Sequence, residues 1–291
     1  MTLATKRPQR AREAAAGGTL QSARGNRLPS RRRMPLRLTA RTPVTATATT
    51  AWTLADHVAT QTCAGVAATL DLDHPRHGVT VAAGSLCDHL LGIALSGSVT
   101  AVTHADERPT EHWLRGTDVT AIYEPADPRR LRATAMWRPF PAPDAAAWEL
   151  VASAQTSLLA SDASLAVVSD LAAAEVLCNA DPTAAGGWHR LDATVACGRE
   201  TTAVLARRPA PDGARATSVL LAVHPADART IAVTRREGRV GVACWLFSAT
   251  LEKGVLLRGR VLAAVGPATG DLAWSARLTG QFAASAAPLS T

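Results

Sequence analysis

Apolar and polar positions alternate over short segments along most of this chain. The segments LRATAMW (131–137) and WELVASAQT (148–156) show the alternation expected of a strand with one buried face. Clusters of Gly, Pro and Asp, such as RPFPAPD (138–144), separate the segments. We therefore predict strands over residues 64–72, 78–83, 98–104, 117–123, 131–138, 147–156, 164–169, 191–197, 201–207, 217–224, 229–235, 239–247, 255–265 and 271–282.

Helical patterns are few and short. WTLADHVATQT (52–62) predicts one short helix, and residues 248–253 predict a single helical turn. Leu171–Cys178 is ambiguous between a helix and an edge strand. Because no long helices alternate with the strands, a parallel α/β sheet is disfavoured. The pattern predicts an all-β fold: a large two-sheet β-sandwich made of two related halves, preceded by a disordered basic N-terminal tail.

Two stretches one hundred residues apart resemble each other. Arg115–Arg130 (RGTDVTAIYEPADPRR) and Arg215–Thr230 (RATSVLLAVHPADART) match at seven of sixteen positions without a gap. Each predicts an apolar strand that runs into a Pro-Ala-Asp turn. An internal duplication explains this match, and so does chance in a chain rich in Ala, Arg and common turn residues.

The predicted organisation has three parts. Residues 1–50 form a tail, residues 51–180 a first β-rich half, and residues 181–291 a second β-rich half, with the junction in NADPTAAGGW (179–188). Halves that share both sheets are the preferred arrangement, and two separate smaller sandwiches are the alternative.

Positive charge is concentrated near the N-terminus. Residues 1–45 carry eleven basic side chains and one acidic side chain, a net charge of +10, so the rest of the chain is at −3 within the total of +7. A mildly acidic body argues against nucleic-acid binding by the folded part. Clustered charge and few apolar residues predict disorder for residues 1–50. A start of translation at Met34 is preferred to an organelle transit peptide.

Cysteine and apolar patterns indicate a cytoplasmic protein. The five cysteines are odd in number and include no C-x-x-C pair, which disfavours a disulfide framework and favours a reducing compartment. No apolar run reaches the length of about 18 residues that a membrane-spanning helix needs. The familiar hydrolase, metalloprotease, P-loop and dinucleotide motifs are absent, and we predict neither a cofactor nor a metal.

Histidines and carboxylates in predicted turns are candidates for acid–base chemistry. His74 and His77 follow Asp71 and Asp73, a group that suits either a divalent metal or, as we prefer, an ordinary solvated turn. The remaining candidates for a catalytic pair lie in polar turns or at strand ends, where exposed loop residues are the alternative explanation: His104, Glu111, His112, Glu124 and His224.

Seven tryptophans are an unusual number beside one tyrosine and three phenylalanines. An exposed indole ring can stack on the C–H face of a sugar, whereas core packing between two sheets explains the same residues without a ligand. We predict ligand-binding roles for Trp137 and Trp148, which flank one hairpin. Lys253 is a third candidate, because the chain otherwise uses Arg almost throughout and a lysine can contact an anion as a point charge.

Three phrases carry a family resemblance: RGTDVTAIYE, WELVASAQTSLLAS and LFSATLEKGVLLRGRV. Together they resemble an uncharacterised family of bacterial hypothetical proteins over about residues 110–291. The resemblance implies a folded protein with a dispensable N-terminus, and it brings no function or catalytic residue. The size and two-half β pattern are also similar, at the level of the fold alone, to the sugar-binding sandwiches of the mutarotase type.

Three functions follow as hypotheses. The first is a non-catalytic binding or accessory protein with a carbohydrate ligand. The second is a sugar-modifying, epimerase-like enzyme with a His/Glu pair, which requires two of the candidates to lie within about 6 Å of each other in a concave pocket. The third is a structural partner protein with a large exposed apolar patch.

Overall fold

The computed structural model describes residues 51–83, 86–95, 108–124, 131–179, 187–192, 195–197, 201–208, 216–227 and 230–288. All of these lie in one compact unit, Thr45–Thr291. The predicted tail, the predicted strand 98–104, the candidate His104 and the first Pro-Ala-Asp turn lie outside the described residues.

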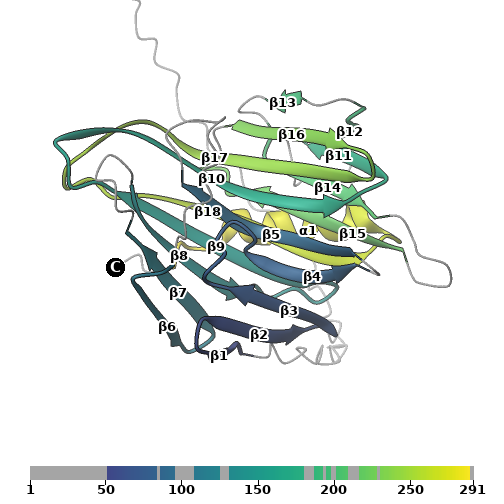
Figure 1. Cartoon of the computed structure of the whole chain (residues 1–291). Helices are drawn as coiled ribbons and strands as arrows, with labels where there is room; N and C mark the ends of the chain where they lie inside the picture. Colours follow the sequence, from purple (N-terminus) through teal and green to yellow (C-terminus); the bar gives the residue numbers. More distant parts are fainter. Residues whose placement is uncertain are drawn as a thin grey trace, which may run out of the picture. The chain divides into compact units, whose positions relative to one another are not determined.

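Two nine-stranded antiparallel sheets make up the fold (Figure 1). The first sheet contains, from edge to edge, β1 (Thr53–Ala55), β2 (Val58–Cys63), β3 (Val66–Asp71), β4 (Val79–Ala83), β5 (Leu86–Leu95), β10 (Ala160–Ala172), β17 (Arg239–Glu252), β16 (Thr230–Arg236) and β13 (Val195–Cys197). The second sheet contains β12 (Trp188–Arg190), β11 (Glu175–Asn179), β14 (Ala203–Arg207), β15 (Thr217–Val223), β18 (Leu257–Pro267), β9 (Ala146–Gln155), β8 (Arg132–Pro139), β7 (Asp118–Tyr123) and β6 (Glu111–Arg115). This arrangement confirms the predicted all-β, two-sheet sandwich.

Strands from both predicted halves occur in both sheets. In the first sheet β10 pairs with β5 and β17, and in the second sheet β9 pairs with β18. The two predicted halves therefore share both sheets, which is the arrangement that the sequence analysis preferred. The strands of the two repeated stretches, β7 and β15, both belong to the second sheet. The origin of the two stretches by internal duplication stays a prediction, and so does the boundary of the halves between residues 180 and 181.

The core between the sheets contains large aromatic side chains of the second sheet, whose polar atoms bond to the first sheet. Trp137 donates its indole N–H to the carbonyl oxygen of Leu91 at 2.9 Å. Trp148 donates to Oε1 of Gln61 at 2.7 Å. Each bond satisfies a donor that is buried on folding, which would otherwise cost about 1–3 kcal/mol. These contacts therefore join the two sheets while leaving their indole donors paired.

Three predicted elements are wrong. Residues 52–62 form the hairpin of β1 and β2 instead of a helix, and alternate residues of β2 are buried. Residues 271–282 form a helix, α1 (Asp271–Ala284), instead of a strand. Its buried apolar residues Trp274, Leu278 and Phe282 recur every four residues, which is the spacing of one helical face. The predicted turn at 248–253 is also wrong, because β17 continues to Glu252.

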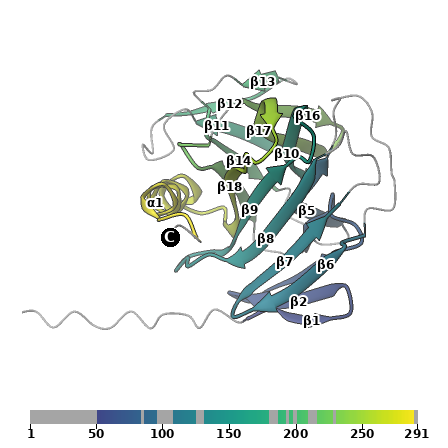
Figure 2. The same cartoon turned by 90° about the vertical axis from the view of Figure 1, so that its left-hand side faces the viewer.

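Helix α1 lies on the outer face of the second sheet (Figure 2). Its apolar face packs on Leu205, Leu220, Leu262 and neighbouring residues, a core separate from the one between the sheets. The helix is the last described element, and no described helix is long and apolar enough to cross a membrane. The helix covers part of the sheet and creates an edge against which a pocket can form.

Candidate functional site

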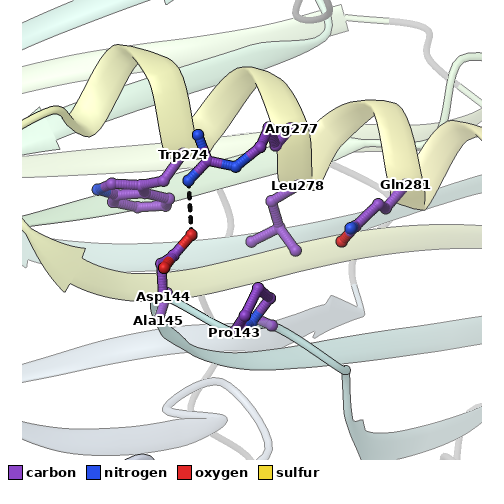
Figure 3. Close-up of a pocket in the computed structure, with 8 residues that line it drawn as sticks. Pro143, Asp144, Ala145, Trp274, Arg277, Leu278 and Gln281 are labelled. Carbon is purple, nitrogen blue, oxygen red and sulfur yellow. Dashed lines mark hydrogen bonds and ion pairs between the residues drawn. The ribbon is translucent and has the colours of Figure 1, made fainter. Parts of the chain in front are cut away.

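A small pocket lies between α1 and the segment that connects β8 to β9 (Figure 3). It has a volume of about 230 Å³ and opens to solvent. The lining residues come from two stretches of chain far apart in sequence: Ala142, Pro143, Asp144, Ala145, Trp274, Arg277, Leu278 and Gln281. Only the docking of the helix on the sheet brings these two stretches together.

The connecting segment supplies one wall. Strand β8 ends at Pro139, and prolines at 141 and 143 restrict the backbone of the segment because each fixes φ and removes an N–H donor. The amide of Phe140 donates to the carbonyl of Ala147 at 2.8 Å, which closes the hairpin. The ring of Phe140 meets that of Phe282 edge to face at 5.8 Å, so the segment is packed against the helix.

The pocket has an apolar floor made by one turn of α1. Trp274 donates its indole N–H to the carbonyl of Pro267 at 2.8 Å, which fixes the plane of the ring. Strand β18 carries Gly266 beneath this ring, and a Cβ atom at that position would lie 2.9 Å from two ring carbons. The absence of a side chain on Gly266 therefore lets Trp274 pack closely on the sheet. Leu278 follows one turn later and is also buried.

The rim of the pocket is polar. Arg277 donates to Oδ2 of Asp144 at 2.5 Å, a bond that crosses the opening in Figure 3. The two side chains are 56% and 50% exposed, so water or a ligand reaches both. Gln281 lies one turn along the same side of the helix and is exposed. The rim therefore offers three kinds of polar group: a carboxylate that accepts hydrogen bonds, a guanidinium that donates them, and an amide that does both.

An ionic network holds the first turn of α1 on the sheet behind the pocket. Asp271 accepts two hydrogen bonds from Arg207, at 2.7 and 3.0 Å, and one from the hydroxyl of Ser218 at 2.8 Å. Burial by itself raises the pKa of Asp271, but the bonds and charge of Arg207 and the Ser218 bond outweigh it, so the pKa lies below its ordinary value. The partner shifts in the opposite direction: hydrogen bonds to Asp271 and Glu175 raise the pKa of Arg207.

A second ion pair fixes the other end of the helix. Arg260 of β18 donates to Glu149 of β9 at 2.5 Å, and both side chains are almost fully buried. The same guanidinium donates to the backbone and hydroxyl oxygens of Ser285, just beyond α1, and lies 4.9 Å from the ring centre of Phe282. The wall of the pocket that belongs to α1 is thus held at both ends.

The lining residues suit binding better than proton transfer. Asp144 is the one carboxylate among the eight lining residues, and none of them is a histidine or a cysteine. Acid–base catalysis at carbon or at a glycosidic bond usually uses two such groups on either side of the substrate. Among the described residues there is also no group of three or more His, Cys, Asp or Glu side chains that could hold a metal ion.

None of the contacts among the described residues brings two of the predicted acid–base candidates together. Glu111 and His112 are neighbours on β6 and point to opposite faces of the sheet, and the ring of His112 meets His57 at 4.6 Å. Glu124 forms an ion pair with Arg132 at 2.7 Å. His224 instead packs against Phe282 at 5.4 Å, on the helix side of the sheet. His104 lies outside the described residues.

The predicted ligand-binding residues lie away from the pocket. Trp137 and Trp148 are fully buried between the sheets, where core packing, the alternative in the sequence analysis, accounts for both; their predicted ligand-binding role stays a prediction. Both residues point inward because they occupy the core-facing positions of β8 and β9. Lys253 is exposed in the turn after β17 and does not line the pocket. Trp274 is the tryptophan that lines the pocket. Its four-residue spacing to Leu278 is the signal in the sequence that would have placed both residues on one face of a helix.

The turn DLDHPRHG (71–78) contributes to a cluster of histidines that extends to His89 on β5. His57 bonds to Asp73 at 2.6 Å, and His74 bonds to Asp71 at 2.8 Å. Farther along, His77 stacks on His89 at 4.4 Å. Burial, followed by the charge of His77, lowers the pKa of His89. The sequence analysis identified the turn, but it did not connect the turn with His57 and His89.

Comparisons with known proteins concern the fold. No protein-family model matches the sequence, and no curated protein matches it. Solved structures with a similar fold include an α-galactosidase from Geobacillus stearothermophilus, with a TM-score of 0.48 and 8% identity over 75% of this chain and 41% of that protein. The chain thus spans about two fifths of that enzyme's length.

Two further structures belong to smaller proteins. A putative mutarotase from Salmonella typhimurium has a TM-score of 0.42 and 10% identity over 75% of this chain and 94% of that one. A putative aldose 1-epimerase from Escherichia coli K12 has a TM-score of 0.37 and 7% identity over 57% and 67%. The sequence analysis expected a weak fold-level likeness to mutarotase-type sandwiches, and the chain is weakly similar to these two structures in fold; the similarity assigns no residue role.

Proposed function

We propose that this chain is a non-catalytic carbohydrate-binding or accessory protein, and that it holds a sugar ring in the pocket between α1 and residues 140–145. The observation that carries the proposal is the combination of an apolar floor, formed by the largely buried Trp274 (4% exposed) and Leu278, with a polar rim at Arg277, Asp144 and Gln281. A sugar ring has an apolar C–H face and hydroxyl groups around its edge, and it needs these two kinds of contact together.

The size of the pocket supports a small ligand. The pocket is shallow: its volume of about 230 Å³ includes space that is open to solvent, so it encloses much less than a site for a drug-sized molecule. Such a hollow can contact one face of a sugar ring or the end of a longer chain of sugars, without enclosing either. The open side of the pocket leaves room for the rest of an oligosaccharide.

The polar rim supports recognition of hydroxyl groups. Asp144 already accepts a bond from Arg277, and each retains further hydrogen-bonding capacity toward solvent. A hydroxyl group that donates to the carboxylate and accepts from the guanidinium replaces water at both. Binding is favoured over an epimerase-like activity because the pocket lacks a second acid–base group and because no contact joins two of the described candidates.

Calorimetric titration of the chain against a panel of neutral mono- and oligosaccharides tests the proposal. We expect saturable binding of at least one sugar. Arg277→Ala removes charge-assisted hydrogen bonds, so the dissociation constant should rise about tenfold or more. Arg236→Ala is the matched control, because Arg236 is an exposed arginine of β16 outside the pocket. No heat of binding with any sugar, or equal affinity in both variants, would contradict the proposal.

A further inference from the structure

Strand β6 forms one edge of the second sheet. It pairs with β7 on one side, and no described strand pairs with its other side. An edge strand presents unpaired N–H and C=O groups and is a template for pairing with another chain. Natural proteins protect such edges with short strands, with charged side chains (lysine above all), with proline or with a bulge. β6 is short and has a charged residue at each end, Glu111 and Arg115, but it contains no lysine, proline or bulge.

Two large apolar side chains of β6 are exposed. Trp113 is 38% exposed and points to the outer face of the sheet, and Leu114 is 39% exposed and points to the opposite face. Four other large apolar side chains among the described residues have similar or greater exposure: Val58, Leu159, Val255 and Leu256. The exposure of Trp113 and Leu114 matters here because both lie on an unpaired edge, where a pairing strand would cover them.

The sequence of β6, EHWLR, is complementary to itself. When two copies pair antiparallel about Trp113, Glu111 of each lies opposite Arg115 of the other, and the two Trp113 rings lie opposite each other. Directly opposite residues in such a pair share a face and approach within about 5.5 Å. Both charge pairs are then attractive, and the central pair is aromatic. Neither Glu111 nor Arg115 has an ion-pair partner among the described residues of its own chain.

The other edge strands lack this pattern. β1 (TLA) has no charged side chain, and β13 (VAC) has none either. In β12 (WHR) antiparallel self-pairing places Trp188 opposite Arg190 and histidine opposite histidine. The charge arrangement therefore distinguishes β6 from every other described sheet edge.

The edge strand of the first sheet, β1, is the neighbour that a partner on β6 would meet. β1 lies close to β6, and its exposed residues Thr53 and Ala55 are small. Figure 2 shows β6 and β1 at the same end of the sandwich. A second copy related by a two-fold axis through Trp113 brings its own β1 to the same side.

We propose that two copies of this chain associate through antiparallel pairing of β6 with β6, which joins their second sheets into one continuous sheet. The interface is isologous, since the same surface serves both partners. A contact of one five-residue strand is small by the standard of stable interfaces, so the dimer is weak and concentration-dependent. The proposal concerns a surface different from the sugar pocket and does not depend on it.

Charge reversal with restoration tests the proposal by sedimentation equilibrium of the full-length chain across the micromolar range. In the wild type we expect a monomer–dimer equilibrium that weakens as salt is added. Glu111→Arg or Arg115→Glu alone makes both symmetry-related pairs repulsive, so dimerisation should weaken about tenfold or more. The double variant E111R/R115E restores both attractive pairs, and its dimerisation should return toward that of the wild type.

Circular dichroism provides the control for folding. Both residues are exposed, so each variant should keep the wild-type spectrum, although Glu at position 115 faces Asp118 within the β6–β7 hairpin. The double variant shares that feature and should still pair, which separates a local effect from loss of the interface. A monomeric wild type at every concentration, or a dimer that both single reversals leave unchanged, would overturn the proposal.

Discussion

Replacement of Asp271 by Asn should destabilise the docking of α1 strongly. Asp271 is the first residue of the helix, its side chain is 4% exposed, and it accepts bonds from Arg207, Ser218 and its own neighbour Leu272. The amide of Asn keeps one acceptor oxygen and turns the other into a donor. At least one bond from Arg207 or Ser218 is therefore lost, and the negative charge opposite Arg207 is removed.

The expected loss follows from the burial of the two partners. A hydrogen bond to a charged group contributes about 1.5–3 kcal/mol, and breaking a buried ion pair costs about 3–5 kcal/mol. Arg207 is 34% exposed, so water compensates part of its charge and the lower range applies. We expect the free energy of unfolding to fall by about 2–3 kcal/mol. The interaction with the positive N-terminal end of the helix dipole adds to this loss.

Urea unfolding followed by circular dichroism measures this difference. The matched control is Asp144→Asn, which removes a carboxylate from a pair whose members are about half exposed, 56% for Arg277 and 50% for Asp144. Exposed pairs contribute about 0–1 kcal/mol, so this variant should unfold close to the wild type. Equal losses of stability in the two variants would refute the argument that burial decides the strength of these pairs.

The pH dependence of stability provides an independent check on the same residue. The pKa of Asp271 is lower in the folded chain than its ordinary value, so the unfolded chain binds the proton more readily. Its contribution is present above the unfolded pKa of about 3.9 and is lost as the pH falls through the folded pKa. The wild type should therefore lose more stability on acidification than Asp271→Asn does. Parallel pH profiles would contradict the assigned direction.

Two further predictions concern packing and thiol reactivity. Gly266→Ala places a Cβ atom 2.9 Å from the ring of Trp274, so we expect the free energy of unfolding, measured in urea, to fall by about 1–3 kcal/mol. The same change at Gly241, where a Cβ atom meets nothing nearer than 3.9 Å, should lower it less. Equal losses in the two variants would show that Trp274 moves freely. Burial raises the pKa of the Cys244 thiol to about 12, so Cys244 should resist a thiol reagent in the native chain while the exposed Cys87 reacts. Rapid labelling of Cys244 itself, located by peptide mass spectrometry, would contradict this.

Local alternation was sufficient to predict most strands of the fold. β8 and β9 were predicted within a residue or two of their bounds, because a strand with one buried face must place apolar side chains at every second position. The same pattern failed at α1. The segment DLAWSARLTGQF (271–282) contains alternating apolar residues, yet its larger ones lie four apart, and burial of that face on the sheet decided for a helix.

The sequence by itself determined the class of fold and the acidic character of the body, since both follow from residue types and their period along the chain. Only the tertiary structure decided which tryptophans lie inside and which polar groups meet. Trp148 and Trp274 are equally aromatic, but the first faces the opposing sheet and the second lines a pocket. Asp144 and Arg277 lie more than a hundred positions apart, and they pair because α1 docks beside the β8–β9 connection. Such contacts depend on how elements pack, and periodicity along one segment carries no information about its partner.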